Sequence, residues 1–239
     1  MEKHKSENLN GEAGDSEKTR SEKRKVCFID SGVGGYVTYL AFCDLLFRRG
    51  GKNFELFYFA DALNSPYGAK SQKQIASVLC AAVCKLQSQY GIKTFVLACN
   101  TATACAIDLL RVNFPNLQFF GIEPAIKPAL KSGQKTLVML TTATFFNSRL
   151  VKQFKDDRNL FFLPLTSVAR EIDDKLNAPE TLNALTQRIL RPYINKGIKN
   201  VVLGCTHYNF LRPYIKRTLG NVRFFEPSLA VATRVYLLS

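Results

Sequence analysis

The sequence predicts an α/β protein made of two similar halves, each a parallel sheet covered by helices, with the active site in the cleft between them. From Val26 onward, short apolar runs alternate with longer amphipathic stretches, as they do in βαβ units. Residues 94–104 (TFVLACNTATA) and 200–210 (NVVLGCTHYNF) resemble each other, which indicates an internal repeat. The chain has 239 residues, of which 46% are hydrophobic, enough for a sizeable core.

Eight apolar runs predict short strands that are buried on both faces, because such strands lack the alternation of a half-exposed sheet. Two amphipathic stretches predict long helices, residues 71–91 ending on Gly91 and residues 179–197 ending on Gly197. Glycine commonly ends helices because it adopts a positive φ without a Cβ clash. The eight predicted strands are VCFID, ELFYFAD, TFVLAC, LQFFGI, TLVML, LFFLPL, NVVLGC and VRFF.

The repeat also predicts where the domains divide. Its two cysteines lie 106 positions apart, and the Glu-Pro pairs at 123–124 and 226–227 lie 103 apart. Proline ends regular structure and stiffens a linker, so we expect the chain to cross between the halves at these pairs. The predicted parts are a disordered charged tail (1–25), a first domain (26–122 with 226–239) and a second domain (123–225).

The net charge of +14 lies almost wholly on the folded body, since residues 1–25 carry only +1. A basic body suits an anionic ligand, nucleic acid or a solvated surface, and charge alone does not separate these. The interleaved aromatic and arginine motifs of an RNA-binding module are missing, which argues against nucleic acid. Neither a membrane-length apolar run nor a signal peptide is visible, so we expect a cytoplasmic protein without a membrane partner.

Seven cysteines, an odd number without a CxxC pair, indicate reduced thiols. Cys80 and Cys84 share a predicted helix face, but no second pair accompanies them, so we expect no metal site. Cys99 and Cys205 differ from the others because each ends a strand just before a predicted helix N-terminus. The helix dipole favours the thiolate there. We interpret the remaining cysteines as packing residues: Cys27, Cys43, Cys80, Cys84 and Cys105.

Two further strands end in polar turns. Asp30 ends the first strand and runs into a Gly-rich turn, residues 31–35, while Asp61 is followed by Ser-Pro-Tyr-Gly. The Gly-rich turn departs from the dinucleotide motif GxGxxG, because Val37 stands where the last glycine belongs. It is more typical of a tight turn whose backbone N–H groups hold a small anion such as a carboxylate.

Four motifs together carry a family resemblance. DSGVGG (30–35), SPYG (65–68), ACNTA (98–102) and LGCTHY (203–208) resemble the signature of glutamate racemases, in the same order and spacing. The resemblance covers residues 26–239, within the aspartate/glutamate racemase superfamily.

This resemblance implies cofactor-independent racemisation of L-glutamate to D-glutamate, which supplies D-glutamate for peptidoglycan. Cys99 and Cys205 would act as two bases on opposite faces of the substrate, because racemisation removes the Cα proton on one face and returns a proton on the other. Asp30 and His207 would assist, and Glu171 falls where the family has an acidic residue near the second cysteine. The implied substrate-binding residues are Asp30, Ser31, Pro66, Tyr67, Gly68, Asn100, Thr101, Thr141, Thr144, Thr206 and His207.

The resemblance implies no cofactor and no metal, with glutamate as the small-molecule partner. AIKPA (125–129) and LNALTQRILRPYI (182–194) are most similar to the enteric-type branch of proteobacteria, in which a UDP-linked muramyl-alanine activates the enzyme. A homodimer is compatible with the family. The alternatives are an aspartate racemase or related isomerase, since substrate length is not legible from sequence, and a basic nucleic-acid-binding protein.

Overall fold

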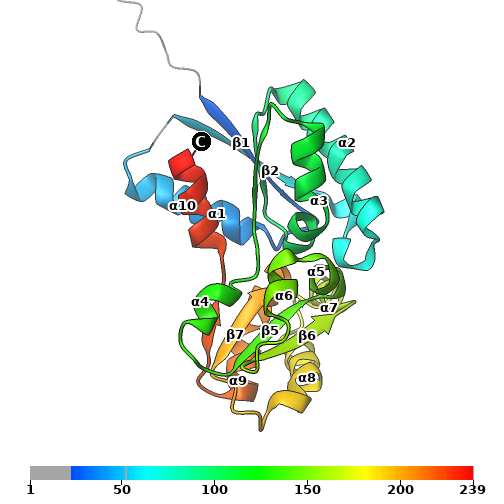
Figure 1. Ribbon diagram of the computed structural model, residues 1–239, viewed down its shortest axis with the longest axis vertical. Helices are drawn as coiled ribbons and strands as arrows, with labels where there is room; N and C mark the ends of the chain where they lie inside the picture. Colours follow the sequence, from blue (N-terminus) through cyan, green and yellow to red (C-terminus); the bar gives the residue numbers. More distant parts are fainter. Residues whose placement is uncertain (1–22, 52, 239) are drawn as a thin grey trace, which may run out of the picture.

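The computed structural model describes residues 23–51 and 53–238, which form two lobes, each built on a four-stranded parallel sheet (Figure 1). All eight predicted strands are present. The strand order is β2-β1-β3-β4 in the first sheet and β6-β5-β7-β8 in the second, so the same topology occurs twice and the predicted fold class is confirmed. The strands are β1 (Arg24–Asp30), β2 (Phe54–Ala60), β3 (Thr94–Leu97), β4 (Gln118–Gly121), β5 (Thr136–Thr141), β6 (Leu160–Leu165), β7 (Asn200–Gly204) and β8 (Arg223–Phe225).

Helices cover both faces of the first sheet. Cys27 and Ile29 of β1 face α2 (Gln72–Tyr90) and α3 (Asn100–Asn113). Val26 and Phe28 face α1 (Tyr36–Arg48) and α10 (Ser228–Leu238) on the other side. Burial on both faces explains why the strand is a continuous apolar run rather than an alternating one.

The second sheet is covered in the same way. Leu137 and Met139 of β5 pack toward α7 (Val168–Asp173), α8 (Pro179–Leu190) and α9 (Arg212–Leu219). Val138 and Leu140 pack on the opposite face with α4 (Ile126–Leu130), α5 (Thr142–Asn147) and α6 (Arg149–Phe154). Across the described residues, no helix has the length and apolar character that a membrane crossing requires.

One of the two predicted helix ends is confirmed and the other is wrong. Gly91 ends α2 with φ 65°, and at the other end of that helix Ser71 and Gln74 form a capping box. The second helix stops at Leu190 instead of Gly197 and continues as a 3₁₀ turn, η3 (Arg191–Tyr193). Pro192 explains the early end, because it has no backbone N–H to donate to the preceding helical turn.

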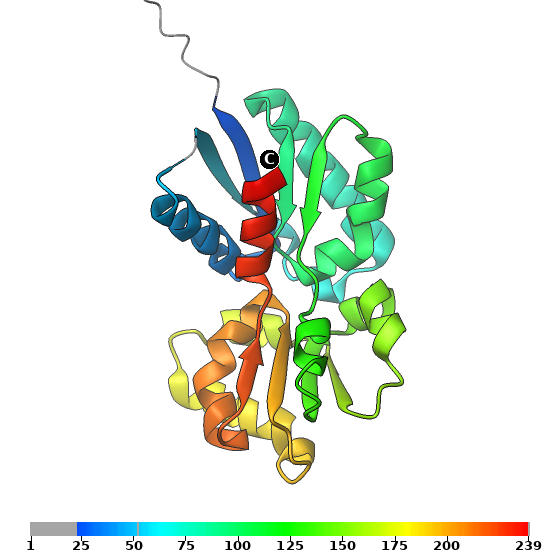
Figure 2. The same ribbon diagram turned by 60° about the vertical axis from the view of Figure 1, so that its left-hand side comes forward.

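The chain crosses between the lobes at the two Glu-Pro pairs. Residues 122–125 lead from β4 to α4, which packs on the second sheet. Residues 226–227 lead from β8 back to α10, which lies against α1 on the first sheet (Figure 2). These crossings support the predicted domain division, whose exact bounds stay a prediction.

The predicted boundary of the N-terminal tail is wrong by two residues. Residues 1–22 lie outside the described residues. Arg24 and Lys25, which we expected in the tail, already belong to β1 and pair with Phe54 and Glu55 of β2. The first strand therefore begins two residues before the predicted boundary.

Candidate active site

The strand order reverses beside the first strand of each sheet, which is where ligands bind in open α/β folds. In the first sheet, β1 ends at Asp30 and the neighbouring β3 leads into Cys99. In the second sheet, β5 ends at Thr141 and the neighbouring β7 leads into Cys205. The two cysteines therefore occupy equivalent positions in the two lobes.

The Gly-rich turn after β1 packs directly against the turn after β7. A Cβ added to Gly34 would lie 2.6 Å from Thr206 Oγ1 and 2.9 Å from His207 N. The Gly35 N–H donates to Asp30 Oδ2 at 2.6 Å. The glycines thus allow a close approach between the lobes, and the Gly35 N–H binds the chain's own Asp30. That the turn also holds a carboxylate of a ligand stays a prediction.

Cys99 is the N-cap residue of α3, and only 6% of it is exposed. Burial raises the pKa of its thiol well above the ordinary value, and the charges of Asp30 and Cys205 raise it further, against a lowering by the Ala102 N–H. The expectation that the helix N-terminus lowers this pKa is therefore wrong for Cys99, because burial and the neighbouring carboxylate outweigh the dipole. This environment favours the protonated thiol of Cys99 over the thiolate.

Cys205 is followed by the 3₁₀ helix η4 (Thr206–Leu211) and has an imidazole beside it. His207 Nδ1 lies 3.9 Å from Cys205 Sγ, and His207 Nε2 lies 3.3 Å from Asp173 Oδ2. Burial lowers the pKa of His207, but Asp173, Cys205 and Asp30 outweigh this and raise it to about 11. This raised pKa favours the imidazolium form of the ring, which lies beside Cys205 Sγ.

Three threonine hydroxyls connect the lobes. Thr101 at the start of α3 lies 2.9 Å from Thr141 and 3.2 Å from Thr144, measured between Oγ1 atoms. Thr141 and Thr144 lie 2.9 Å apart, and Thr141 also accepts the Thr144 N–H as the N-cap of α5. All three are buried. The structure thus brings together three of the predicted substrate-binding residues from two lobes.

The Ser-Pro-Tyr-Gly turn lies beside this cluster. A Cβ on Gly68 would lie 3.0 Å from the Thr141 side chain, so the turn contacts the second lobe. Tyr67 is buried and donates its hydroxyl to Asp61 Oδ2 at 2.8 Å. Pro66 precedes Tyr67 at the start of the 3₁₀ turn η2 (Tyr67–Ala69), which follows η1 (Ala62–Asn64).

Ser31, which follows the end of β1, and Asn100, which follows Cys99, are both buried. The two polar atoms of the Asn100 amide are buried and have no hydrogen-bond partner among the described residues. Such a group costs free energy unless something binds it, which suits a residue that receives a ligand.

Glu171 is not part of the group around Cys205 as the structure describes it. Its carboxylate pairs with Arg188 at 2.9 Å and with Lys175 at 3.8 Å. Asp173, two residues further along α7, is the carboxylate that contacts His207, and sequence reasoning missed it. The segment Arg-Glu-Ile-Asp-Asp carries three carboxylates, and its spacing does not reveal which one faces the imidazole.

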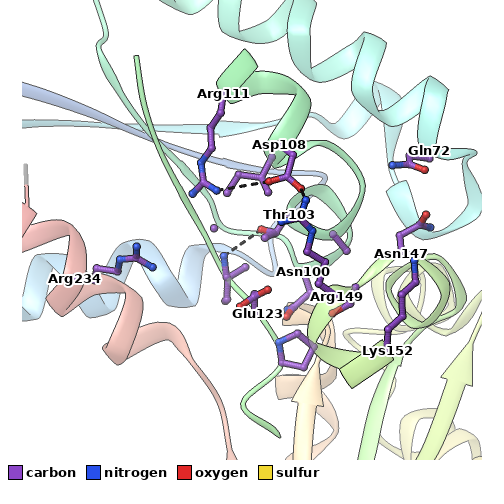
Figure 3. A pocket seen from close by; sticks show the side chains of 16 residues that line it. Gln72, Asn100, Thr103, Asp108, Arg111, Glu123, Asn147, Arg149, Lys152 and Arg234 are labelled. Carbon is purple, nitrogen blue, oxygen red and sulfur yellow. Dashed lines mark hydrogen bonds and ion pairs between the residues drawn. The ribbon is translucent and has the colours of Figure 1, made fainter. Parts of the chain in front are cut away.

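A cavity of about 430 Å³ lies where the chain first crosses between the lobes (Figure 3). Four cationic and two acidic side chains line it, together with Asn100. Arg149 pairs with Asp108 at 2.8 Å, whereas Lys152 and Arg234 have no ion-pair partner within the part of the chain that is described. The charged lining residues are Arg111, Arg149, Lys152, Arg234, Asp108 and Glu123. Within the described ranges, no three His, Cys, Asp or Glu side chains cluster as a metal site would require.

The profile of the Asp/Glu/Hydantoin racemase family matches residues 43–235. The chain belongs to this family. It is 35% identical over 221 residues to a glutamate racemase of Pseudomonas aeruginosa, a match covering 90% of this chain and 81% of the relative. It is 34% identical over 206 residues to a glutamate racemase of Clostridium botulinum, covering 84% and 76%.

Solved structures of glutamate racemases are similar to this chain in fold. The crystal structure of Escherichia coli glutamate racemase, in complex with L-glutamate and the activator UDP-MurNAc-Ala, superimposes with a TM-score of 0.78. That chain is 30% identical, and the match covers 90% of this chain and 82% of the other. Glutamate racemase from Aquifex pyrophilus gives a TM-score of 0.71 at 27% identity, covering 90% and 84%.

Proposed function

We propose that this chain interconverts L- and D-glutamate, with Cys99 and Cys205 as the two groups that exchange protons with Cα. The observation that carries the proposal is the equivalent placement of two thiols at the switch points of two repeated sheets. The electrostatic effect of Cys205 on Cys99 supports their proximity across one site. Relatives in this family that are named glutamate racemase support the substrate.

In each direction, one cysteine thiolate removes the Cα proton and becomes a thiol. The opposite thiol then donates its proton to the other face of the carbanion and becomes a thiolate, so the protons balance within one turnover. Asp30 lies beside Cys99, and His207 lies beside Cys205. Both are placed to take part in proton handling at their own thiol.

We infer that the substrate's ammonium and carboxylate groups bind the polar side chains between the two thiols. The clustered hydroxyls of Thr101, Thr141 and Thr144 can exchange their mutual hydrogen bonds for bonds to a substrate carboxylate. The unpartnered Asn100 amide is a further donor and acceptor. Other buried or turn residues proposed to line the binding site are Asp30, Ser31, Pro66, Tyr67, Gly68, Thr206 and His207.

We propose that the enzyme works in the cytoplasm, where D-glutamate is needed for peptidoglycan precursors. All seven cysteines are free thiols, which suits a reducing compartment. We propose glutamate as the small-molecule partner, and we propose that the enzyme binds neither a membrane nor nucleic acid. The homodimer stays a prediction that light scattering of the purified chain would test.

We further propose that the cavity at the crossing binds a UDP-linked muramyl-alanine as an activator. Four cations against two carboxylates give its wall a net positive charge, which suits a diphosphate. Asn100 lines the cavity and is the chain neighbour of Cys99, so a ligand there contacts the element that holds the first thiol. The Escherichia coli relative, whose structure contains UDP-MurNAc-Ala, supports this choice of ligand.

The decisive experiment follows circular dichroism of pure D-glutamate and, separately, of pure D-aspartate with the purified protein. We expect the signal of glutamate to decay to zero and that of aspartate to persist. Decay with aspartate alone would assign the substrate to the shorter amino acid, and no decay with either would refute racemase activity. Repeating the glutamate assay with the activator should raise the rate, and Lys152→Met should weaken that response.

A further inference from the structure

Asp61 is a buried carboxylate that the mechanism proposed above does not use. It directly follows the last residue of β2, and only 7% of it is exposed. Tyr67 donates its hydroxyl to Asp61 Oδ2 at 2.8 Å. Asn64 Nδ2 donates to both carboxylate oxygens, at 2.9 Å to Oδ1 and 3.1 Å to Oδ2. Because Asn64 and Tyr67 stand on either side of the Ser-Pro pair, one carboxylate fixes both sides of the turn at residues 65–68.

A carboxylate is a costly side chain at this place if packing alone is required. Removing a charge from water costs free energy unless the charge is paired or well hydrogen-bonded. Within the described ranges, no lysine, arginine or histidine forms an ion pair with Asp61, so its partners are the neutral donors of Asn64 and Tyr67. A hydrogen bond to an ionised acceptor is roughly twice as strong as a neutral one. The charge of Asp61 therefore adds strength and direction to the bond with Tyr67.

The electrostatic environment of Tyr67 agrees with this geometry. Tyr67 is buried in the first lobe, in the same apolar core as Cys99. Burial raises the pKa of Tyr67, and the hydrogen bond and charge of Asp61 raise it further, ahead of the charges of Cys99 and Asp30. The Tyr67 hydroxyl therefore stays a donor to Asp61, on a ring that lies within electrostatic reach of the first thiol.

The contacts continue from Tyr67 into the second lobe. The next residue, Gly68, approaches Thr141 so closely that an added Cβ would lie 3.0 Å from Thr141 Cγ2 and 3.1 Å from Thr141 Cβ. Thr141 belongs to the hydroxyl cluster that connects the lobes. At the other end, the backbone N–H of Asp61 donates to the Asp30 carbonyl at 2.8 Å. Asp61 thus links the end of β1 to the place where the turn meets the second lobe.

We propose that Asp61 is a positioning residue for glutamate binding, acting through the Tyr67 hydroxyl. This inference rests on the racemase function proposed above, in which Pro66, Tyr67 and Gly68 line the substrate site. Asp61 fixes the position of this turn, whereas the two thiols lie on other elements. Loss of the Asp61 carboxylate should therefore weaken substrate binding more than it slows proton transfer.

The test measures kcat and KM from each enantiomer of glutamate, by circular dichroism, in the parent, Asp61→Asn and Tyr67→Phe. We expect KM to rise roughly tenfold in both variants, as loss of a hydrogen bond to a charged group does, and kcat to fall less than about threefold. Tyr193→Phe is a matched control, because it also removes one tyrosine hydroxyl. That hydroxyl donates to the Phe162 carbonyl at 3.2 Å in the second lobe, so the control should keep the parent's KM.

A double-mutant cycle shows whether Asp61 acts through Tyr67. If it does, the variant that combines Asp61→Asn with Tyr67→Phe should raise KM no more than about the larger of the two single effects. Effects on KM that multiply would overturn the inference, because the two side chains would then act independently. The Tm of each variant is measured alongside, and the dissociation constant of glutamate is measured by calorimetry.

An unchanged KM in Tyr67→Phe would overturn the inference even if its Tm falls, because the contact with Asp61 would then only stabilise the fold. A fall in kcat without a rise in KM would overturn it too. If Asp61→Asn does not fold, Tyr67→Phe still decides, since it removes the same hydrogen bond and keeps the ring. A parent protein that racemises neither enantiomer would instead refute the proposed function, so the two failures are distinguishable.

Discussion

Replacing Gly34 with alanine tests the close approach on which the site depends. The added Cβ would lie 2.6 Å from Thr206 Oγ1 and 2.9 Å from both His207 N and His207 Nδ1. Two of these atoms belong to side chains, but the His207 backbone nitrogen cannot move aside by a change of rotamer. Gly34 does not have a positive φ, so the substitution adds volume without adding backbone strain.

The turns must separate by several tenths of an ångström to admit the methyl group. Overpacking of this kind costs about 1–3 kcal/mol. For a chain of this size each kcal/mol lowers the Tm by about 2–4 °C, so we expect a decrease of roughly 2–12 °C. We also expect kcat to fall, by up to about 100-fold, because a misplacement of about 1 Å near a reacting group costs on the order of that factor and the methyl group pushes on His207.

The assay compares kcat from circular dichroism with Tm from thermal melting, for Gly34→Ala and for the control Gly32→Ala. A Cβ on Gly32 would meet His207 Nε2 at 3.3 Å, which a small shift relieves, so the control should lose much less activity. A Gly34→Ala protein with the parent's kcat and Tm would refute the close packing of the two turns.

Three other perturbations have defined outcomes. Burial raises the pKa of Cys27 to about 12 from its ordinary 9.0. The stability that this thiol contributes is therefore complete below pH 9 and is lost as the pH rises toward 12, at up to about 1.4 kcal/mol per pH unit. Between pH 8.5 and 11, the Tm of Cys27→Val should therefore fall less than the Tm of the parent. Thr101→Val removes one hydroxyl of the buried cluster between the lobes. We expect KM for glutamate to rise about tenfold, since a hydrogen bond to a charged group contributes roughly 1.5–3 kcal/mol. An unchanged KM would show that Thr101 does not bind the substrate. Dialysis against EDTA followed by hydroxylamine should leave kcat unchanged, because two thiols supply both proton-transfer groups; activity that returned only with zinc or pyridoxal phosphate would refute this.

The central strands could be predicted because burial on both faces leaves a direct trace in the sequence. The prediction of full burial is wrong for the edge strand β2, whose residues are only partly buried or exposed because no further strand encloses it within the described residues. A run such as Val-Cys-Phe-Ile-Asp lacks polar residues until it reaches the edge of the sheet, and the polar residue there marks the site. The repeat around Cys99 and Cys205 likewise follows from topology, because each cysteine follows the third strand of an identical strand order. The early end of α8 could also have been predicted from the sequence, since Pro192 lies inside the range that we predicted as one helix.

The rest depends on contacts that no local pattern encodes. The rotation of α7 against η4 determines which of its carboxylates contacts His207. Only the three-dimensional structure shows that this carboxylate is Asp173 and not Glu171. The direction of the Cys99 pKa shift depends on how deeply the thiol is buried and on the nearness of Asp30. The cavity at the crossing combines residues of α3, α6 and α10, which lie far apart along the chain.

Exchange of the Cα hydrogen in heavy water tests the two-thiol mechanism most directly. Pure L- and D-glutamate are incubated separately with the parent, Cys99→Ser and Cys205→Ser, and deuterium at Cα is followed by proton NMR together with optical activity. The parent should convert either enantiomer to the racemate with deuterium in the product, while both variants keep the parent's circular dichroism spectrum but lose interconversion. Near-parental interconversion by either variant would contradict the assignment of one thiol to each face of the substrate.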